Sequence, residues 1–256
     1  MLTLVGLGLW DEKDLSLRGV EEVLKADEVY IELYTSRWYG NIENLKRLLK
    51  KEIKVLERSD IEEKYEKILE KAKEKCIALL VPGDPLIATT HSSLILEAKK
   101  RGIEVKVVHA SSVYSAVAET GLHIYKFGAS ATVPFPERTQ EVLPISTYEV
   151  IRENKKRGLH TLLFLDLIAE ENKFMNPNEA MKILLKTEET MKENVFTENT
   201  HVVVFCRAGS ENSSIFYGKV KDLVKIDFGE PPYVLIVPGK LHFTEKEYLK
   251  LFKVEE

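Results

Sequence analysis

Residues 77–85 read Ile-Ala-Leu-Leu-Val-Pro-Gly-Asp-Pro, an apolar run followed by a Gly-Asp pair that prolines flank. A short run that is apolar at every position is typical of a strand buried on both faces, as in a parallel sheet covered by helices. Because proline fixes its own φ, the two prolines predict a rigid turn at the end of this strand. Asp84 within the turn either helps to hold a ligand or serves as a turn-former or helix cap.

Four similar apolar runs surround this strand in the first half of the chain, at residues 2–5, 29–33, 53–56 and 104–108. Amphipathic stretches alternate with them, the pattern expected when parallel strands are joined by helical crossovers. One of these helices is predicted to begin at Ser59, because Ser59-Asp-Ile-Glu62 has the spacing of a capping box. The first half therefore predicts an α/β domain with a largely parallel sheet.

The second half of the chain changes character after residue 110, where we place the domain boundary. Strands are predicted over residues 161–165, 201–206 and 234–237, with helices over 146–157 and 178–192. Residues 215–220 follow the strand over 201–206 too closely for a helical crossover, which predicts an antiparallel neighbour. The sequence thus predicts two α/β domains, residues 1–110 with a parallel sheet and residues 111–256 with a mixed sheet.

The composition excludes several classes of protein. Lys and Arg number 37 against 41 Asp and Glu, a net charge of −4, which provides no general attraction to nucleic acid or anionic lipid. Apolar runs stop short of the roughly 18 residues that cross a bilayer, and no basic leader precedes the first strand, so a cytoplasmic protein is expected. Cys76 and Cys206 lie in apolar runs, where a thiol usually belongs to the core.

Two further loops follow strands of the first domain. Gly6-Leu-Gly-Leu9 resembles the start of a dinucleotide-binding loop, but Asp11 replaces the third glycine, so a plain strand-end turn is the alternative. His109-Ala-Ser-Ser-Val113 brings hydroxyls to a helix start, where serine often only caps. Loops that follow parallel strands emerge at one edge of the sheet, where α/β proteins bind ligands. We therefore expect one crevice for a small organic ligand that contains an aromatic ring.

Other chemistries lack their motifs. The six histidines form no H-E-x-x-H pair and no C-x-x-C occurs, so no metal site is predicted. No G-x-S-x-G elbow is present either, which leaves nucleophilic hydrolysis unsupported.

Several motifs together carry a family resemblance. Val5-Gly-Leu-Gly-Leu9, Pro82-Gly-Asp-Pro-Leu86 and Ala88-Thr-Thr-His91 resemble the tetrapyrrole methylase superfamily of S-adenosylmethionine-dependent enzymes. More narrowly, the chain is similar to the diphthine synthase family. The segments that carry the narrower likeness are Ser112-Val-Tyr-Ser-Ala116, Thr120-Gly-Leu-His-Ile-Tyr-Lys-Phe-Gly128, Gly158-Leu-His-Thr-Leu-Leu-Phe-Leu-Asp166, Ala208-Gly-Ser210 and Pro232-Tyr-Val-Leu-Ile-Val-Pro-Gly-Lys-Leu-His242.

The resemblance implies a homodimer in which S-adenosylmethionine binds in the cleft between the two domains. It implies methylation of a protein, translation elongation factor 2, at the amino group of a 3-amino-3-carboxypropyl-histidine, to give diphthine in diphthamide biosynthesis. Archaeal members form the trimethylammonium product, and the short chain and its thermophile-like composition favour that type. Carried over by motif, the donor-binding residues are Leu9, Asp84, Ile87, Ser112, Val113, Leu165, Ala208 and Tyr233.

The donor contacts are expected to be mostly backbone contacts, since most of these side chains are aliphatic. At Tyr233 the chain departs from relatives that have histidine there, which still permits a backbone contact. Positioning can supply most of the catalysis in a methyl transfer. Asp166, Glu170, His123 and Tyr125 are candidates to accept a proton, but we assign no catalytic base and expect solvent or a weak base to suffice.

Two alternatives stay open. A superfamily relative that methylates a tetrapyrrole or ribosomal RNA keeps the fold and the donor and changes the acceptor, although the acidic balance of the chain disfavours RNA. A module that binds S-adenosylmethionine without catalysis belongs to a different class. Residues 133–146, rich in proline and charge, form either a contact for the protein acceptor or a plain surface connection.

Overall fold

A computed structural model describes residues 1–254, and the chain divides into two compact units, Met1–Ala116 and Val117–Glu256. We call them unit 1 and unit 2. From the sequence, the division is predicted near residue 110. No helix in the described part of the chain is both long and apolar enough to cross a membrane.

Unit 1 is built on a five-stranded sheet with the order β3-β2-β4-β1-β5. Every neighbouring pair is parallel, and the ladder from Leu2↔Ile77 to Gly6↔Val81 joins β1 to β4 at its centre. The strands are β1 (Leu2–Gly6), β2 (Glu28–Glu32), β3 (Ile53–Leu56), β4 (Ile77–Val81) and β5 (Val105–Val108). The five predicted strands are confirmed, each within one residue at either end.

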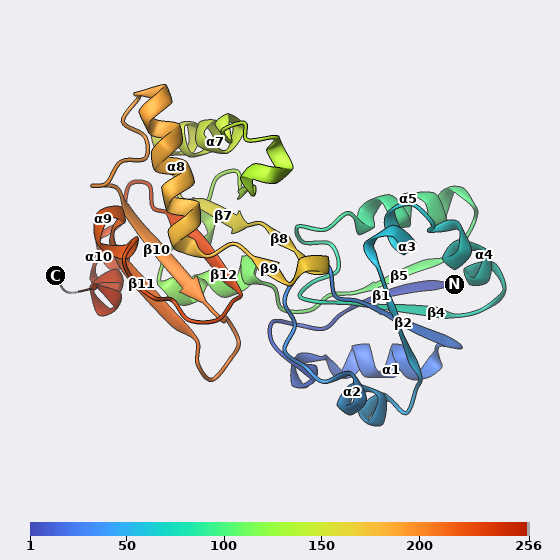
Figure 1. The fold of residues 1–256 in the computed structure, drawn as a ribbon. Helices are drawn as coiled ribbons and strands as arrows, with labels where there is room; N and C mark the ends of the chain where they lie inside the picture. The colour runs from blue at the N-terminus through green and yellow to red at the C-terminus, as the bar shows by residue number, and fades with distance from the viewer. Residues whose placement is uncertain (255–256) are drawn as a thin grey trace. The chain divides into compact units, whose positions relative to one another are not determined.

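Helices cover both faces of this sheet (Figure 1), as the continuously apolar strands require. α1 (Leu17–Lys25) and α2 (Ile42–Leu49) lie on one face, and Val23 and Leu45 pack with Val5 and Leu80 in the core. The other face carries α3 (Arg58–Glu62), α4 (Glu66–Glu74) and α5 (His91–Lys100), and unit 1 ends with α6 (Val113–Ala116).

A helix begins within one residue of Ser59, as predicted, but the capping box predicted at Ser59 and Glu62 is wrong. α3 begins at Arg58, and the carboxylate of Asp60 accepts from the backbone N–H of Glu57 at 3.1 Å, so the capping box lies two residues earlier. α3 ends at Glu62, and α4 follows as a separate helix. α4 buries an apolar face that consists of Ile68, Leu69 and Ala72.

Unit 2 contains a mixed sheet with the order β11-β10-β12-β7-β6. β10 pairs antiparallel with β11 and β12, β12 pairs antiparallel with β7, and β6 runs parallel to β7. The strands are β6 (Ala131–Val133), β7 (Thr161–Leu165), β10 (His201–Cys206), β11 (Ser214–Lys219) and β12 (Tyr233–Val237), and a small ribbon pairs β8 (Leu167–Ile168) with β9 (Lys173–Phe174). The antiparallel neighbour predicted for β10 is confirmed as β11.

Two longer helices pack on the sheet of unit 2. Tyr148 of α7 (Ile145–Lys156) and Leu184 of α8 (Pro177–Met191) share a core with Cys206 and Leu235. Burial raises the pKa of the Cys206 thiol to about 11, and both cysteines are free.

Two short helices complete the unit, α9 (Val220–Leu223) and α10 (Phe243–Leu249). The described residues also form short 3₁₀ helices. Unit 1 contains η1 (Glu12–Asp14), and unit 2 contains η2 (Val117–Thr120), η3 (Ile124–Lys126), η4 (Pro136–Thr139), η5 (Ala169–Glu171) and η6 (Lys250–Phe252).

Candidate functional site

The loops that follow β1 and β4 are joined by backbone hydrogen bonds. Gly83 N donates to Gly8 O at 2.8 Å, and Gly8 N donates to Gly83 O at 3.2 Å. Both residues have a positive φ, +81° at Gly8 and +67° at Gly83, which glycine adopts without steric cost. The two glycines therefore fix the mutual position of the loops after β1 and β4.

Asp84 ties this pair of loops to the loop that follows β5. Its carboxylate, almost completely buried, accepts from Leu86 N at 3.0 Å and from Ala110 N at 3.2 Å. His109 Nδ1 lies 2.8 Å from the same carboxylate and donates to it. Asp84 is thus both the turn-former that the sequence allowed and the link between two loops.

Gly6, the last residue of β1, leaves space for the other two loops. A Cβ at this position would lie 2.6 Å from both Gly83 O and the Cβ of Ala110. Contacts this short do not occur between real atoms, so any side chain at Gly6 must displace one of the loops. The loops after β1, β4 and β5 can therefore meet only because Gly6 has no side chain.

The five donor-binding residues predicted in unit 1 all lie on these loops. Leu9 is half-buried after Gly8, and Ile87 is 38% exposed beyond the Gly-Asp-Pro turn. Ser112 is buried, and its hydroxyl accepts from Tyr114 N at 3.1 Å, so it caps α6, which begins at Val113. The structure brings the five residues to the carboxyl edge of the parallel sheet.

Asp11 has a local structural role. Its carboxylate accepts from Lys13 N at 2.8 Å and caps η1. A cap at this position accounts for the acidic residue where a dinucleotide motif would have glycine. Asp11 is therefore a structural residue of the loop after β1.

The three residues predicted in unit 2 also meet at one sheet edge. Cys206 pairs with Tyr233 across β10 and β12, which places Ala208 just beyond this pair. Val234 pairs with Phe164 across β12 and β7, so the next position along the register brings Leu165 opposite Tyr233. The five residues predicted in unit 1 and the three predicted in unit 2 are therefore each brought together within their own unit.

Arg207 fixes the backbone around Ala208 and Tyr233. Its guanidinium donates to Phe228 O and Glu230 O, both at 2.7 Å, and to Asn212 O at 3.0 Å. It thereby joins the loop after β10 to the segment before β12, while the Tyr233 hydroxyl donates to Gly229 O. The sequence carried no local signal for the part played by the Arg207 guanidinium.

Asp166 is already engaged in holding the chain. Its carboxylate accepts from Phe135 N at 3.0 Å, from Leu167 N at 2.9 Å and from Arg138 Nη1 at 3.2 Å. Two of these bonds hold the segment that follows β6. Asp166 therefore holds the segment after β6 in place.

The other three candidate bases lie elsewhere in unit 2. Glu170 is exposed in η5, whereas His123 and Tyr125 neighbour each other with ring centroids 5.5 Å apart. The His123 ring also lies beside Thr244 of α10, with Nε2 3.2 Å from Oγ1. Glu170 therefore lies on η5, whereas His123 and Tyr125 belong to a different element, η3 and its N-cap.

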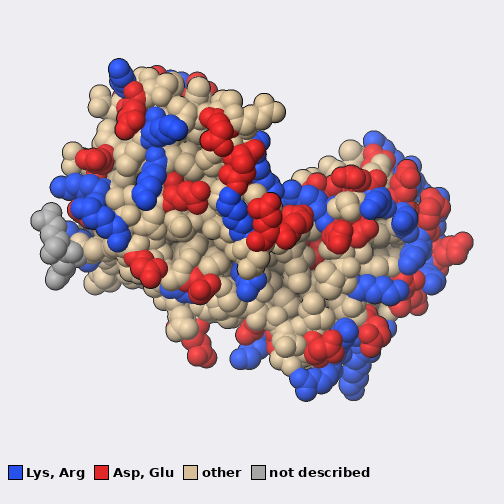
Figure 2. All heavy atoms as spheres, viewed as in Figure 1, with Lys and Arg blue, Asp and Glu red and all other residues tan. Residues whose placement is uncertain are grey.

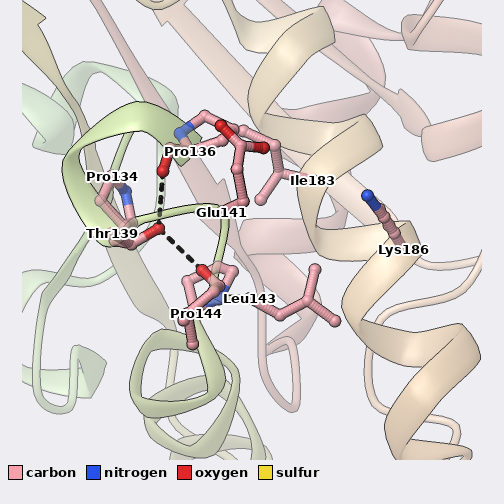
Figure 3. A pocket seen from close by; sticks show the side chains of 9 residues that line it. Pro134, Pro136, Thr139, Glu141, Leu143, Pro144, Ile183 and Lys186 are labelled. Carbon is pink, nitrogen blue, oxygen red and sulfur yellow. Dashed lines mark hydrogen bonds between the residues drawn. The ribbon is translucent and has the colours of Figure 1, made fainter.

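The segment between β6 and α7 encloses a small hollow against α8 (Figure 3). Thr139 Oγ1 lies 3.0 Å from Pro136 O and 2.7 Å from Val142 O, so its hydroxyl holds the two arms of the loop together. Ile183 and Lys186 of α8 line the opposite side. The loop is therefore ordered by its own contacts, in the way that functional surface loops often are.

The Gly-Asp-Pro turn can accept a ligand against its backbone. Apart from Gly83 and its two chain neighbours, no heavy atom of the described residues lies within 4 Å of the position that a Cβ would take at Gly83. The peptide of Gly83 is therefore open on that side, while the buried Asp84 carboxylate keeps the turn rigid. Open backbone groups and aliphatic neighbours such as Ile87 are typical of a site for a small organic ligand.

Comparison with known proteins gives consistent matches. Residues 1–224 match the family of Tetrapyrrole (Corrin/Porphyrin) Methylases. A diphthine synthase of Methanocaldococcus jannaschii is 48% identical over 253 residues, 98% of each chain, and one of Methanococcus vannielii is 47% identical over 251 residues, again 98% of each chain. A crystal structure of a diphthine synthase superposes with a TM-score of 0.89 at 42% identity and covers 98% of this chain and 95% of that one. The matches extend across both units.

Proposed function

Because this chain belongs to the tetrapyrrole methylase family and, within it, to the diphthine synthases, we propose that it methylates the amino group of 3-amino-3-carboxypropyl-histidine in translation elongation factor 2. It is an S-adenosylmethionine-dependent methyltransferase of diphthamide biosynthesis. The proposed product is diphthine, the trimethylated amine. The two archaeal relatives named above support the archaeal type of reaction.

The proposed donor site comprises Leu9, Asp84, Ile87, Ser112 and Val113 of unit 1 together with Leu165, Ala208 and Tyr233 of unit 2. The observation that carries it is the bonding of the three loops of unit 1 through Gly8, Gly83 and Asp84. Rigid loops lose little conformational entropy when they bind a ligand, so backbone groups can hold the donor tightly. Asp84 acts through the loops that it fixes.

The chain's own contribution to the reaction is binding and orientation. When bound, S-adenosylmethionine supplies an electrophilic methyl group on a sulfonium. Leu9, Ile87 and Val113 present apolar surface that excludes water from the ligand, and the fixed loops restrict its orientation. Held geometry of this kind contributes up to roughly 7–11 kcal/mol to a displacement between two reactants.

Proton release needs no dedicated residue in this proposal. Three methylations of an ammonium group release three protons, one before each transfer. Asp166 is occupied by Phe135, Leu167 and Arg138, which supports the view that solvent or a weak base accepts them. Asp166 would instead hold the loop after β6, which we propose as a contact for the elongation factor.

The remaining parts of the proposal concern partners and place. We propose a cytoplasmic homodimer that binds the elongation factor and not nucleic acid. Basic and acidic side chains alternate over the face shown in Figure 2, in line with the 37 basic and 41 acidic residues of the chain. A mixed surface supports recognition of a protein rather than of a phosphate backbone.

The test is methyl transfer to the acceptor itself. Elongation factor 2 that carries the 3-amino-3-carboxypropyl group is incubated with the protein and S-adenosylmethionine and analysed by mass spectrometry. We expect a mass increase of three methyl groups at the modified histidine, and none on unmodified factor. Donor binding without a mass increase would support a non-catalytic module, and methylation of a tetrapyrrole or ribosomal RNA instead would contradict the proposed acceptor.

A further inference from the structure

His91 holds the Gly-Asp-Pro turn from its buried side. It is the first residue of α5 and its side chain is inaccessible to solvent, with Nδ1 3.2 Å from Pro85 O. Because a carbonyl oxygen only accepts, Nδ1 carries a proton and donates. Thr89 Oγ1 donates to the same oxygen at 2.8 Å. Two side chains of one segment therefore fix the Pro85 peptide.

The other ring nitrogen of His91 faces a buried carboxyl group. Nε2 lies 3.9 Å from Oε1 of Glu32, the last residue of β2, whose side chain is also fully buried. Glu32 Oε2 accepts from Tyr34 N at 3.0 Å and Thr35 N at 3.1 Å, and Oε1 accepts from the Thr35 hydroxyl. Among the described residues, His91 Nε2 has no hydrogen-bond partner.

A proton on the Glu32 carboxyl resolves this arrangement, because it places a neutral group opposite the Nε2 lone pair, 3.9 Å away. Burial raises the pKa of Glu32 to about 7 and lowers the pKa of His91, because both charged forms lose hydration. Without a proton, the Nε2 lone pair and an ionised carboxylate would repel each other in a buried place. The charged groups around the pair are Arg58 and Glu62 of α3, and Arg58 lies over the Tyr34 ring at 5.3 Å.

We propose that His91 is a positioning residue for donor binding, and that a proton on the Glu32 carboxyl, which leaves a neutral group facing His91 Nε2, keeps the imidazole in the orientation in which Nδ1–H holds the Pro85 carbonyl. The inference rests on the proposed donor site, because Pro85 lies in the turn that contains Asp84 and precedes Ile87. Glu32 and His91 touch neither substrate; they act through the turn.

A dependence on pH follows from the proton on the Glu32 carboxyl. The proton is present below about pH 7, where the Glu32 carboxyl keeps it, and is lost as the pH rises above that value. The bare carboxylate then repels Nε2, the ring turns, and Pro85 O loses one of its two donors. Donor affinity is therefore expected to fall in alkaline solution.

The variants are chosen to replace single atoms. Glu32→Gln keeps an oxygen for Tyr34 N and Thr35 N and places an N–H toward His91 Nε2 at every pH. His91→Asn places its amide nitrogen near the position of Nδ1, within reach of Pro85 O, whereas His91→Gln places its amide nitrogen near the position of Nε2. The Asn and Gln variants lose the same ring and differ in which hydrogen bond they can keep.

The experiment titrates S-adenosylhomocysteine into each protein by calorimetry between pH 6 and 9. We expect wild-type affinity to fall about tenfold across this range and the affinity of Glu32→Gln to stay at its pH 6 value, the size of effect that one hydrogen bond supports. Titration of the ligand itself affects both proteins equally, so the difference between their curves reports the pair. His91→Gln is expected to bind about tenfold more weakly than His91→Asn at pH 6.

Parallel pH curves for the wild type and Glu32→Gln, or equal affinities of His91→Asn and His91→Gln, would overturn the inference. If a His91 variant does not fold, the comparison of wild type with Glu32→Gln decides alone. A wild-type protein that binds no S-adenosylhomocysteine at any pH contradicts the proposed donor site itself and is thereby distinguished from failure of this inference.

Discussion

Replacing Gly6 with alanine is expected to lower the rate of methyl transfer about a hundredfold, the effect of a displacement of about 1 Å in a positioned reaction. The new Cβ would lie 2.6 Å from Gly83 O and from the Cβ of Ala110, so the loop after β4 or the loop after β5 must move. Single-turnover kinetics with modified elongation factor 2 measure the rate, and calorimetry measures the accompanying loss of donor affinity.

Gly218→Ala is the matched control. Gly218 lies in β11, and a Cβ there would lie 3.4 Å from the nearest atom of Leu223, an ordinary contact. This variant is expected to transfer methyl groups at the wild-type rate. Wild-type kinetics for Gly6→Ala would show that the close approach of the three loops does not matter for the reaction.

Glu245→Gln is expected to lower the free energy of unfolding of unit 2 by about 3 kcal/mol at pH 7, as when one partner of a buried ion pair is removed. The fully buried Glu245 carboxylate accepts from His123 N at 2.9 Å and His242 N at 2.6 Å, and also from Lys126 Nζ. His160 Nε2 donates at 2.9 Å, since Nδ1 of the same ring accepts from Gly239 N. Urea denaturation followed by far-ultraviolet circular dichroism measures the loss.

The effect depends on pH with a definite sign. Hydrogen bonds from Lys126, His123 and His242 outweigh burial and lower the pKa of Glu245 from 4.5 to about 2. The stabilisation is therefore complete above pH 4.5 and is lost as the pH falls toward 2, so the difference between the wild type and Glu245→Gln should shrink over that range. Glu247→Gln, an exposed change in the same helix, is the control and should cost less than about 1 kcal/mol. Equal stability of the two variants at pH 7 would contradict the assignment.

The sequence predicted the strands and the edges that they form. Buried parallel strands must be apolar at every position, so runs such as Ile77–Val81 identify themselves. The rule that loops after parallel strands share one edge then placed Leu9, Asp84 and Ser112 together, and the structure brings their loops together within unit 1. The apolar pattern of the strands and the direction of the chain were sufficient to predict the strands and the edge of the sheet at which their loops meet.

Side-chain contacts between distant segments could not be predicted from local pattern. Glu245 lies 85 residues from His160 and 122 residues from His123, and Glu32 belongs to a strand that reads as apolar around it. The capping box was misplaced for a related reason, because Glu57 and Asp60 offer the same spacing as Ser59 and Glu62. Which of two equivalent spacings is used depends on the packing of the whole helix.

A crystal structure of the protein with S-adenosylhomocysteine tests the central claim most directly. We predict electron density for the ligand against the Gly-Asp-Pro turn, within contact distance of Ile87, Ser112 and Val113 in unit 1 and of Leu165 and Ala208 in unit 2. Density for the ligand at any other place, with these residues free of contact, would contradict the account.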